Sequence, residues 1–398
     1  MKILIASPLP SVAIHELRSL GAEVLSEPSL SADELPARLS DANVLVVGRT
    51  RVSNTALESA RHLQLIVRTG ADVSSIAIEE ASAQGVFVAH VPSMDAIAVA
   101  EMALALMLAL DRGLVDAALA SREGRKRPDL GDARGLAGRT LGILGSGLAA
   151  QLLARRAQAL EMRVLCWSPA LTQPRAAEMG AEFCTWPREL ARKSDVVAVL
   201  APPESGGEQT VDAEFVQNMR DASYLVHIGH PAAIDESALA DAISKRRIRV
   251  ASDAYSAEPM SETQRARSAL AALPGVIATS RLAGATQQAR EAIAAEVVRI
   301  VRAFLVSGEI HNCVNLCERS PATWQLMMRV RDQPGVMAAI MDVIRADGIN
   351  AEEISSRVFL GAKAAWCTIA LDERPSSEAL ESMRGMDNVL HLELRAVV

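Results

Sequence analysis

The sequence predicts an α/β protein built around a doubly wound, mostly parallel sheet. Short apolar segments alternate with amphipathic helical ones, which is the pattern of strands joined by crossover helices. A glycine-rich turn follows one such segment at residues 145–147, and half of the 398 residues are hydrophobic, enough for more than one core. These features predict two α/β units followed by a smaller module.

Two series of strands are expected, separated by a long apolar helix. The clearest strands of the first unit lie at 2–6, 44–48, 63–68 and 86–90. The second unit begins at Leu141, and its later strands are expected at 163–167, 195–200, 224–228, 248–253 and 276–279. Helices at 96–114 and 286–305 have apolar faces, so we expect the chain to cross between the units twice. The first unit is then discontinuous in sequence.

The second unit opens with a strand, a glycine turn and a helix, which together can hold a dinucleotide pyrophosphate. Apolar residues 141–144 lead into Gly145, which permits the tight turn, and Gly147, which lets the backbone approach the phosphates. Ala150 takes the small position where the helix packs on the strand, and the helix amides face the anion. The turn therefore predicts a bound dinucleotide.

A third unit follows the Ser320-Pro321 break. Its elements are expected to be a strand at 324–331, a helix at 334–347, two strands over 349–371, a helix at 376–384 and a strand at 388–396. This βαββαβ order is a ferredoxin-like plan. The module has no obvious place for catalysis, so oligomerisation or ligand sensing is the expected role.

Composition excludes several classes of protein. With 41 basic and 48 acidic residues the chain has a net charge of −7 and no basic stripe, which argues against nucleic-acid binding and favours small-molecule chemistry. Five cysteines without a CxxC pair fit free thiols in a reducing compartment, and the scattered histidines predict no metal site. Charged residues interrupt the apolar segment 96–114, so we expect no membrane span and a cytoplasmic location.

Several blocks of the sequence, in order, resemble the D-2-hydroxyacid dehydrogenase family, and specifically D-3-phosphoglycerate dehydrogenases with a C-terminal ACT domain. The blocks are residues 65–70, 98–101, 145–150, 225–239, 253–259 and 334–336. The resemblance covers essentially the whole chain. It implies a flavodoxin-like substrate lobe of residues 1–97 and 285–315, an NAD-binding Rossmann domain of residues 98–284, and an ACT-like regulatory domain of residues 322–398.

The resemblance also implies a reaction. In this family an arginine binds the substrate carboxylate, and a histidine oriented by a glutamate takes the hydroxyl proton as hydride passes to the nicotinamide. Glu258 matches the orienting glutamate. His230 stands where the family has the arginine, and Arg281 stands where it has the histidine. The two catalytic residue types are therefore exchanged.

Three interpretations of the exchange remain open. In the first, His230 and Arg281 trade roles, with His230 as the base near Glu258 and Arg281 as the carboxylate clamp. In the second, dehydrogenation is lost or very slow, because Arg281 stays protonated and a misplacement of about 1 Å can cost roughly 100-fold in rate. In the third, both are ordinary surface residues. The sequence thus supports an NAD(P)-dependent 2-hydroxyacid oxidoreductase or a catalytically silent NAD(P)-binding or metabolite-sensing homologue.

Cofactor positions follow from the same resemblance. Leu148 and Ala149 open the helix after the glycine turn, and Ser168 stands at the ribose-binding position. Asp253 matches the residue that faces the nicotinamide carboxamide, or alternatively caps its strand end. Because Ser168 lacks the acidic side chain that repels a 2′-phosphate, NAD is only mildly favoured and NADP is not excluded.

On the substrate side, Gly70 and Ala71 belong to an anion-binding turn after Arg68. Asp72 replaces a usual glycine there and would repel a carboxylate if it faced the site. Arg49 matches an arginine near the phosphate of phosphoglycerate, or is simply a surface charge. A small 2-hydroxy or 2-oxo acid is the expected partner.

In the ACT-like module, Asp332 and Asn350 match residues of an amino-acid effector site. Val330 stands where serine-regulated relatives have a histidine, so an amino-acid effector is expected with serine disfavoured. Edge-to-edge pairing of modules is expected from the exposed sheet edges of this plan. Family dimers form through the dinucleotide domain, so the resemblance implies a homodimer or homotetramer.

Overall fold

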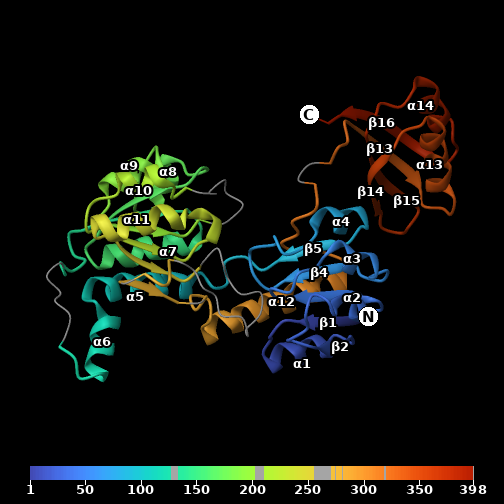
Figure 1. The fold of residues 1–398 in the computed structure, drawn as a ribbon. Helices are drawn as coiled ribbons and strands as arrows, with labels where there is room; N and C mark the ends of the chain where they lie inside the picture. The colour runs from blue at the N-terminus through green and yellow to red at the C-terminus, as the bar shows by residue number, and fades with distance from the viewer. Residues whose placement is uncertain are drawn as a thin grey trace. The chain divides into compact units, whose positions relative to one another are not determined.

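The computed structural model describes residues 1–126, 133–201, 210–254, 270–273, 275–279, 281–317 and 320–397. The chain divides into two compact units, Met1–Asn315 and Leu316–Val398. The larger unit holds two parallel sheets, and the smaller one holds an antiparallel sheet (Figure 1). The predicted α/β class with a separate small module is confirmed.

The first sheet has five parallel strands in the order β2-β1-β3-β4-β5, which is the flavodoxin-like order. Its strands are β1 (Lys2–Ala6), β2 (Glu23–Ser26), β3 (Val44–Val47), β4 (Leu65–Arg68) and β5 (Phe87–His90). The helices that cover it are α1 (Ser11–Ser19), α2 (Leu35–Leu39), α3 (Asn54–Glu58), α4 (Ile78–Ala83) and the late helix α12 (Gln287–Ser307). Helices α2, α3 and α4 pack on one face, and α1 and α12 pack on the other, so both faces are apolar.

The segment after α12 returns to the outer edge of β5. The carbonyl of Asn312 accepts the His90 N–H at 3.0 Å, and the Val314 N–H donates to the Val88 carbonyl at 2.8 Å. The Asn315 amide accepts from the Val88 N–H and donates to a neighbouring carbonyl, each at 2.8 Å. The core of the first sheet is therefore completed by residues from both ends of the larger unit.

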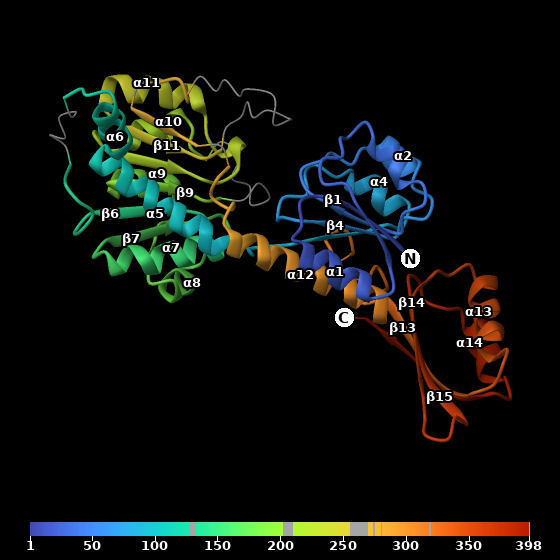
Figure 2. The same ribbon diagram turned by 90° about the horizontal axis from the view of Figure 1, so that it is seen from below.

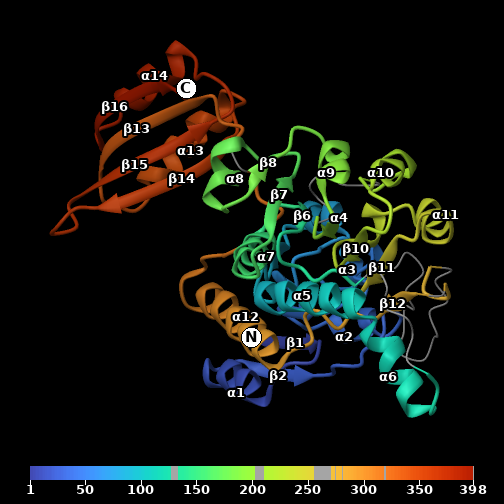
Figure 3. The same cartoon turned by 90° about the vertical axis from the view of Figure 1, so that its left-hand side faces the viewer.

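The second sheet has seven parallel strands in the order β12-β11-β10-β9-β6-β7-β8, a Rossmann order with an added strand. Its strands are β6 (Thr140–Leu144), β7 (Arg163–Trp167), β8 (Glu182–Phe183), β9 (Val196–Val199), β10 (Tyr224–His227), β11 (Arg249–Ser252) and β12 (Val276–Ala278). Its helices are α5 (Ala96–Arg112), α6 (Leu114–Arg122), α7 (Leu148–Ala159), α8 (Gln173–Glu178), α9 (Pro187–Lys193), α10 (Ala213–Asn218), α11 (Glu236–Arg246) and the short 3-10 helix η2 (Pro231–Ala233). Helices α5, α7 and α8 pack on one face, and α9, α10 and α11 on the other (Figure 3).

The structure contains two short strands that the sequence does not predict. Both β2 and β8 lie at the outer edge of their sheets and are only partly buried. A strand at an edge needs less apolar surface than a central one, so its sequence pattern is weak. The central strands, in contrast, are buried throughout and lie where the apolar segments predict them.

The expected helix at 96–114 ends earlier, because Gly113 adopts a left-handed conformation (φ 52°) and α6 begins after it. Within the residues that the structure describes, no helix is long and apolar enough to cross a membrane. The apolar character of α5 is explained by its burial against the seven-stranded sheet.

A fully buried carboxylate, Asp111, joins the end of α5 to the seven-stranded sheet. Its Oδ1 accepts from Arg139 Nη1 at 3.3 Å and from the Tyr224 hydroxyl at 3.1 Å, and its Oδ2 accepts the Gly135 N–H at 3.2 Å. The Arg139 guanidinium also lies 4.3 Å from the centre of the Tyr224 ring. Because a buried charge is tolerated only with such partners, these bonds hold α5 against β6 and β10.

The smaller unit is the predicted ferredoxin-like module. Its elements are β13 (Trp324–Arg331), α13 (Val336–Ala346), β14 (Ala351–Val358), β15 (Ala364–Leu371), α14 (Ser377–Arg384) and β16 (Val389–Ala396). The antiparallel strands have the order β14-β15-β13-β16, and both helices lie on one face of the sheet (Figure 2). The opposite face carries no helix of the module.

Asp111→Ala should lower the free energy of unfolding by about 3–5 kcal/mol, since it leaves the Arg139 charge buried without its carboxylate. Chemical denaturation followed by circular dichroism measures the loss. Asp33→Ala is the matched control, because Asp33 is exposed before α2 and should change stability by less than about 0.5 kcal/mol. Equal midpoints for the two variants would contradict the role of the Asp111 bonds.

Candidate functional site

The glycine turn after β6 is bonded on both sides to the end of β7. The Gly145 N–H donates to the Trp167 carbonyl at 2.8 Å, and the Gly145 carbonyl accepts from the Cys166 thiol at 3.2 Å. Gly145 has a φ of +125°, and a Cβ on it would lie 3.1 Å from the carbonyl carbon of Leu200. Only glycine therefore fits this position.

Gly147 has a different environment. Its backbone is extended, with φ −67°, and no atom beyond Gly147 and its two chain neighbours lies within 4 Å of the position that a Cβ would take. It is the N-cap of α7, whose first turn contains no acidic residue. Open space in front of helix amides is what a pyrophosphate needs, so these residues fit a dinucleotide. Leu148 is 44% exposed beside this space, whereas Ala150 is buried against the sheet.

Ser168 lies directly after β7 and is buried. Its carbonyl accepts the Leu171 N–H at 3.1 Å, which closes the turn after the strand. The hydroxyl is the polar group that β7 brings to the ribose-binding position expected from the sequence. A hydroxyl can bond a ribose and does not repel a 2′-phosphate.

His230 caps the short helix η2. Its Nδ1 accepts the Ala232 N–H at 3.3 Å. Because a backbone N–H can only donate, the neutral His230 ring carries its hydrogen on Nε2 in this conformation. His230 can therefore donate a hydrogen bond through Nε2, but Nε2 can take up a proton only after the bond to Ala232 is released.

A second histidine, His227, contacts the backbone of the same loop. Its Nε2 lies 3.1 Å from the His230 carbonyl, and its Nδ1 lies 3.1 Å from the Ser252 hydroxyl. Burial lowers the pKa of His227 to about 4, so the ring is neutral near pH 7. His227 thus joins the loop that follows β10 to the last residue of β11. The sequence assigns it no role, and its only signal is a histidine at the end of an apolar strand.

Asp253 organises the loop that carries Arg281. Its carboxylate accepts from the Thr279 hydroxyl at 2.6 Å and from the N–H groups of Leu282 and Ala283 at 2.8 and 2.9 Å. Arg281 has a φ of +47°, and its N–H donates to the Asp253 carbonyl at 2.9 Å. Of the two roles expected for Asp253, these bonds support the structural one. They also hold Arg281 in an uncommon backbone conformation.

Arg68, at the end of β4, is a site residue to which the sequence alone assigns no task. Its Nε is buried and has no hydrogen-bond partner, and its Nη1 lies 3.2 Å from where a Cβ on Gly70 would be. Burial lowers the pKa of Arg68; the charge of Asp72 opposes this, whereas those of Arg49 and Arg281 add to it. The one signal in the sequence is an arginine that ends a strand of buried residues.

Asp72 lies within electrostatic range of Arg68 and partly balances its positive charge. Burial raises its pKa, but bonds from Ser74 and the charges of His230 and Arg68 outweigh burial, so its pKa lies below the usual value. The bond from the Ser74 N–H is 2.8 Å long. Asp72 is thus ionised, and the repulsion expected from the sequence is lessened by the charge of Arg68.

The structure brings some of the expected site residues within electrostatic range of Arg68 and Asp72. The charges of Arg49 and Arg281 act on Arg68, and the charge of His230 acts on Asp72. The anion-binding turn is held in place by the segment after β5: the Gly70 carbonyl accepts the Val91 N–H at 3.3 Å, and His90 Nδ1 lies 2.9 Å from the Ala71 carbonyl. Glu258 lies outside the described residues, so its distance to His230 stays a prediction.

No three metal-binding side chains of the described residues are grouped so that they could hold an ion. In the module, Asp332 and Asn350 are not brought together within one chain. Asp332 follows β13 at its pairing with Ala364, whereas Asn350 precedes β14 at the end where β15 pairs with Trp324. The two lie a strand length apart, about 25 Å.

Comparisons with known proteins agree with this fold. The family model of the D-isomer specific 2-hydroxyacid dehydrogenase, NAD binding domain, matches residues 104–283. A D-3-phosphoglycerate dehydrogenase of Archaeoglobus fulgidus is 30% identical over 334 residues, which are 82% of this chain and 62% of that protein. A hydroxypyruvate reductase of Thermotoga maritima is 29% identical over 278 residues, 69% of this chain and 89% of that protein.

A solved structure of a Thermus thermophilus protein has the same fold. It superposes with a TM-score of 0.70 and 28% identity, covering 79% of this chain and 100% of that one. The chain spans about three fifths (62%) of the length of the Archaeoglobus relative. The glycine turn, Ser168, His230, Asp253 and Arg281 all fall within the residues that the family model matches. Residues 104–283 are therefore similar to the NAD binding domain of D-isomer specific 2-hydroxyacid dehydrogenases.

Proposed function

We propose that the chain is an NAD(P)-dependent oxidoreductase that transfers hydride between a nicotinamide and the hydroxyl carbon of a small 2-hydroxy acid. One observation carries the proposal: Arg68 lies within electrostatic range of Arg49, Arg281 and Asp72, and Asp72 lies within range of His230, in a chain that also has a dinucleotide turn. Guanidinium groups suit a carboxylate or phosphate. The printed names of the relatives, a phosphoglycerate dehydrogenase and a hydroxypyruvate reductase, support the same substrate class.

In this proposal the domains divide the work. Residues 98–284 hold the cofactor, with the pyrophosphate in front of Gly147 and the ribose at Ser168. Residues 1–97 and 285–315 hold the acid. When bound, the nicotinamide accepts or donates the hydride. The protein supplies the remaining functions, which are to orient the acid and to stabilise charge on its oxygen.

Each site residue then has a task. Arg281 and Arg68 bind the acid's anionic groups through their guanidinium groups. His230 donates a hydrogen bond from Nε2 to the substrate oxygen, and this bond stabilises the negative charge that develops on that oxygen. For oxidation of the hydroxyl, Nε2 must instead accept a proton, which requires His230 to release the Ala232 N–H. Glu258 is proposed to orient His230 in that state.

A catalytically silent, NAD(P)-binding or metabolite-sensing homologue is the second candidate. The observation that favours it is the bond from the Ala232 N–H to His230 Nδ1, which holds the ring in the form that cannot act as a base through Nε2. The guanidinium of Arg281 cannot replace it, because arginine stays protonated. The sensing role then rests on the module, where Asp332 and Asn350 are the proposed effector residues.

We also propose a homodimer formed by the dinucleotide domain, with tetramers through the module as the extension. Helices α5 and α6 expose a set of large apolar side chains: Leu108, Leu114, Val115 and Leu119, each 41–60% exposed. Such a group on neighbouring helices is typical of a protein interface. The five cysteines are all free, which supports the proposed cytoplasmic location.

Gly147→Ala should weaken NADH binding by about tenfold or more without changing the melting temperature. The added methyl meets no protein atom but occupies the space proposed for the pyrophosphate. Titration calorimetry and thermal unfolding of the same samples measure both quantities. Gly145→Ala is the contrasting variant, because its methyl meets the backbone near Leu200 and should lower stability as well. Undiminished NADH affinity in Gly147→Ala would refute the proposed cofactor position.

NADH oxidation across a panel of 2-oxo acids tests the proposed reaction. Activity is expected on at least one acid with a second anionic group, and Arg68→Lys should lower kcat/KM by about tenfold or more, because lysine cannot form the same planar fork. His230→Ala should lower kcat by about 100-fold. His62→Ala is the control, because His62 is exposed and precedes β4, whereas Arg68 lies at the opposite end of that strand. NADH binding without turnover on any acid would leave the silent homologue as the function.

Light scattering should give the mass of at least two chains. Leu114→Asp combined with Leu119→Asp should shift the mass to one chain, since charges on both helical positions oppose burial. The control is Val306→Asp, an exposed apolar residue at the end of α12. A single-chain mass for the unmodified protein would refute the dimer.

A further inference from the structure

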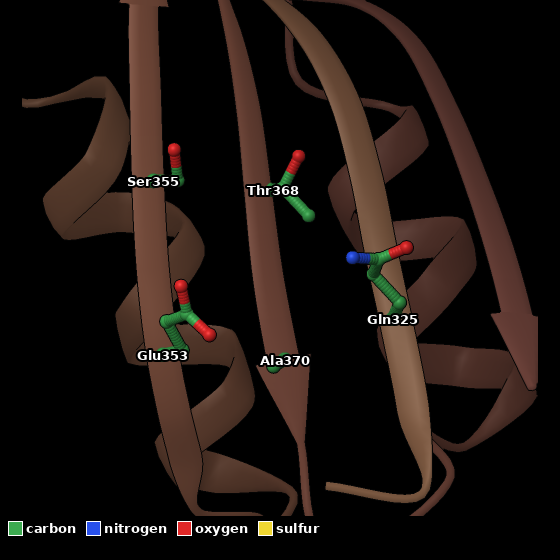
Figure 4. Close-up of a pocket in the computed structure, with 5 residues that line it drawn as sticks. All are labelled: Gln325, Glu353, Ser355, Thr368 and Ala370. Atoms are coloured by element: carbon green, nitrogen blue, oxygen red, sulfur yellow. The ribbon is translucent and has the colours of Figure 1, made fainter. Parts of the chain in front are cut away.

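The helix-free face of the module sheet carries an organised set of polar and aromatic side chains. Leu326, Met328 and Val330 of β13 point into the module core, so the alternate residues of that strand lie on the opposite, open face. The same alternation applies to β15, whose Cys367 and Ile369 are in the core. Figure 4 shows the open face, with both helices behind the sheet.

A shallow cavity lies on this face. It has a volume of about 210 Å³ and is lined by Gln325, Glu353, Ser355, Thr368 and Ala370. In Figure 4 the polar ends of these side chains project from three neighbouring strands on the same side of the sheet. A carboxylate, a carboxamide and two hydroxyls thus border one space. This group can donate and accept hydrogen bonds along the edge of a planar molecule.

Trp366 adjoins the cavity. Its Nε1 donates to the Thr368 hydroxyl at 3.2 Å, so the indole extends along β15 toward the cavity rather than away from the sheet. The ring is half-buried. An indole held along an open sheet presents a flat surface on which a base can stack.

Arginines flank Trp366 on both sides. The strand register places Arg357 of β14 and Arg329 of β13 directly opposite Trp366, and Arg331 one step further along β13. All three are exposed, and none forms an ion pair with a carboxylate of the described residues. In a chain with a net charge of −7, this is a local concentration of positive charge. It suits a phosphate group.

We propose that this face binds a nucleoside monophosphate whose base carries an exocyclic amino group. The base stacks on Trp366 with its edge toward Glu353 and Gln325, where the carboxylate accepts from the amino group. The phosphate lies on Arg357, Arg329 and Arg331. Glu353 and Arg357 are four residues apart on β14, about 13 Å, which an extended nucleotide spans with the help of the side chains.

The surface favours a single nucleotide over a nucleic-acid strand. Glu353 and Glu393 border the arginines on the same face, and Glu393 is paired with Arg395 at 2.8 Å. These carboxylates would repel the further phosphates of a polymer. The positive charge is thus limited to the surroundings of one phosphate.

Titration of AMP into the full-length protein tests the proposal. The Gly147→Ala variant is used as the background, so that the dinucleotide turn competes less for AMP. One AMP per chain is expected at the module. Trp366→Ala and Arg357→Glu should each weaken it by about tenfold or more. Trp186→Ala and Arg384→Glu make the same chemical changes at exposed positions outside this face and should leave binding unchanged.

The other outcomes overturn the proposal. Inorganic phosphate that binds as tightly as AMP would mean a plain anion site, and a single-stranded RNA that binds more tightly would mean a polymer surface. AMP binding that survives in both Trp366→Ala and Arg357→Glu would place the nucleotide elsewhere. Arg357 is exposed on the edge strand β14, so Arg357→Glu should fold normally. This variant therefore still tests the proposal if Trp366→Ala disturbs the sheet. Neither result depends on whether the larger unit passes hydride.

Discussion

The buried carboxylate of Asp111 is the interaction on which the geometry of the larger unit depends. A charge without solvent must have its partners supplied by the fold, and here they come from the segment before β6 and from Tyr224 at the start of β10. These groups lie at the amino ends of the strands. By holding α5 there, they set the positions of strands whose carboxyl ends carry the candidate site. Stability and function are thus assigned to opposite edges of one sheet.

The parallel arrangement explains why residues distant in sequence meet. Gly145 follows β6, His230 follows β10, and Arg281 follows β12, and the carboxyl ends of parallel strands share one edge of a sheet. The loops then depend on buried polar residues: His227 joins the loop after β10 to the end of β11, and Asp253 holds the loop of Arg281. A substitution of either buried polar residue would therefore displace a site residue on the loop that it holds.

Much of this organisation could be predicted from the sequence, because central strands require continuous apolar segments and the glycine turn has a fixed spacing. The edge strands β2 and β8 could not, since partial burial leaves little pattern. Individual side-chain partners could not be predicted either. The hydrogen bond from the Ala232 N–H to His230 and the burial of Arg68 Nε depend on the folded structure, which a linear motif does not contain. The exchange of histidine and arginine is a prediction from the resemblance of the sequence to the family, whereas the hydrogen bond that fixes the tautomer of His230 is found only in the folded structure.

The separation of Asp332 and Asn350 by the length of β13 has a consequence for regulation. If one ligand binds both residues, as proposed, it must lie between two copies of the module, because the two residues are a strand length apart within one copy. Ligand binding and association of the chains would then be thermodynamically linked. The apparent affinity for such a ligand would rise with the protein concentration, and the ligand would lower the concentration at which copies associate. The abundance of the chain itself would become a variable to which the proposed effector site responds.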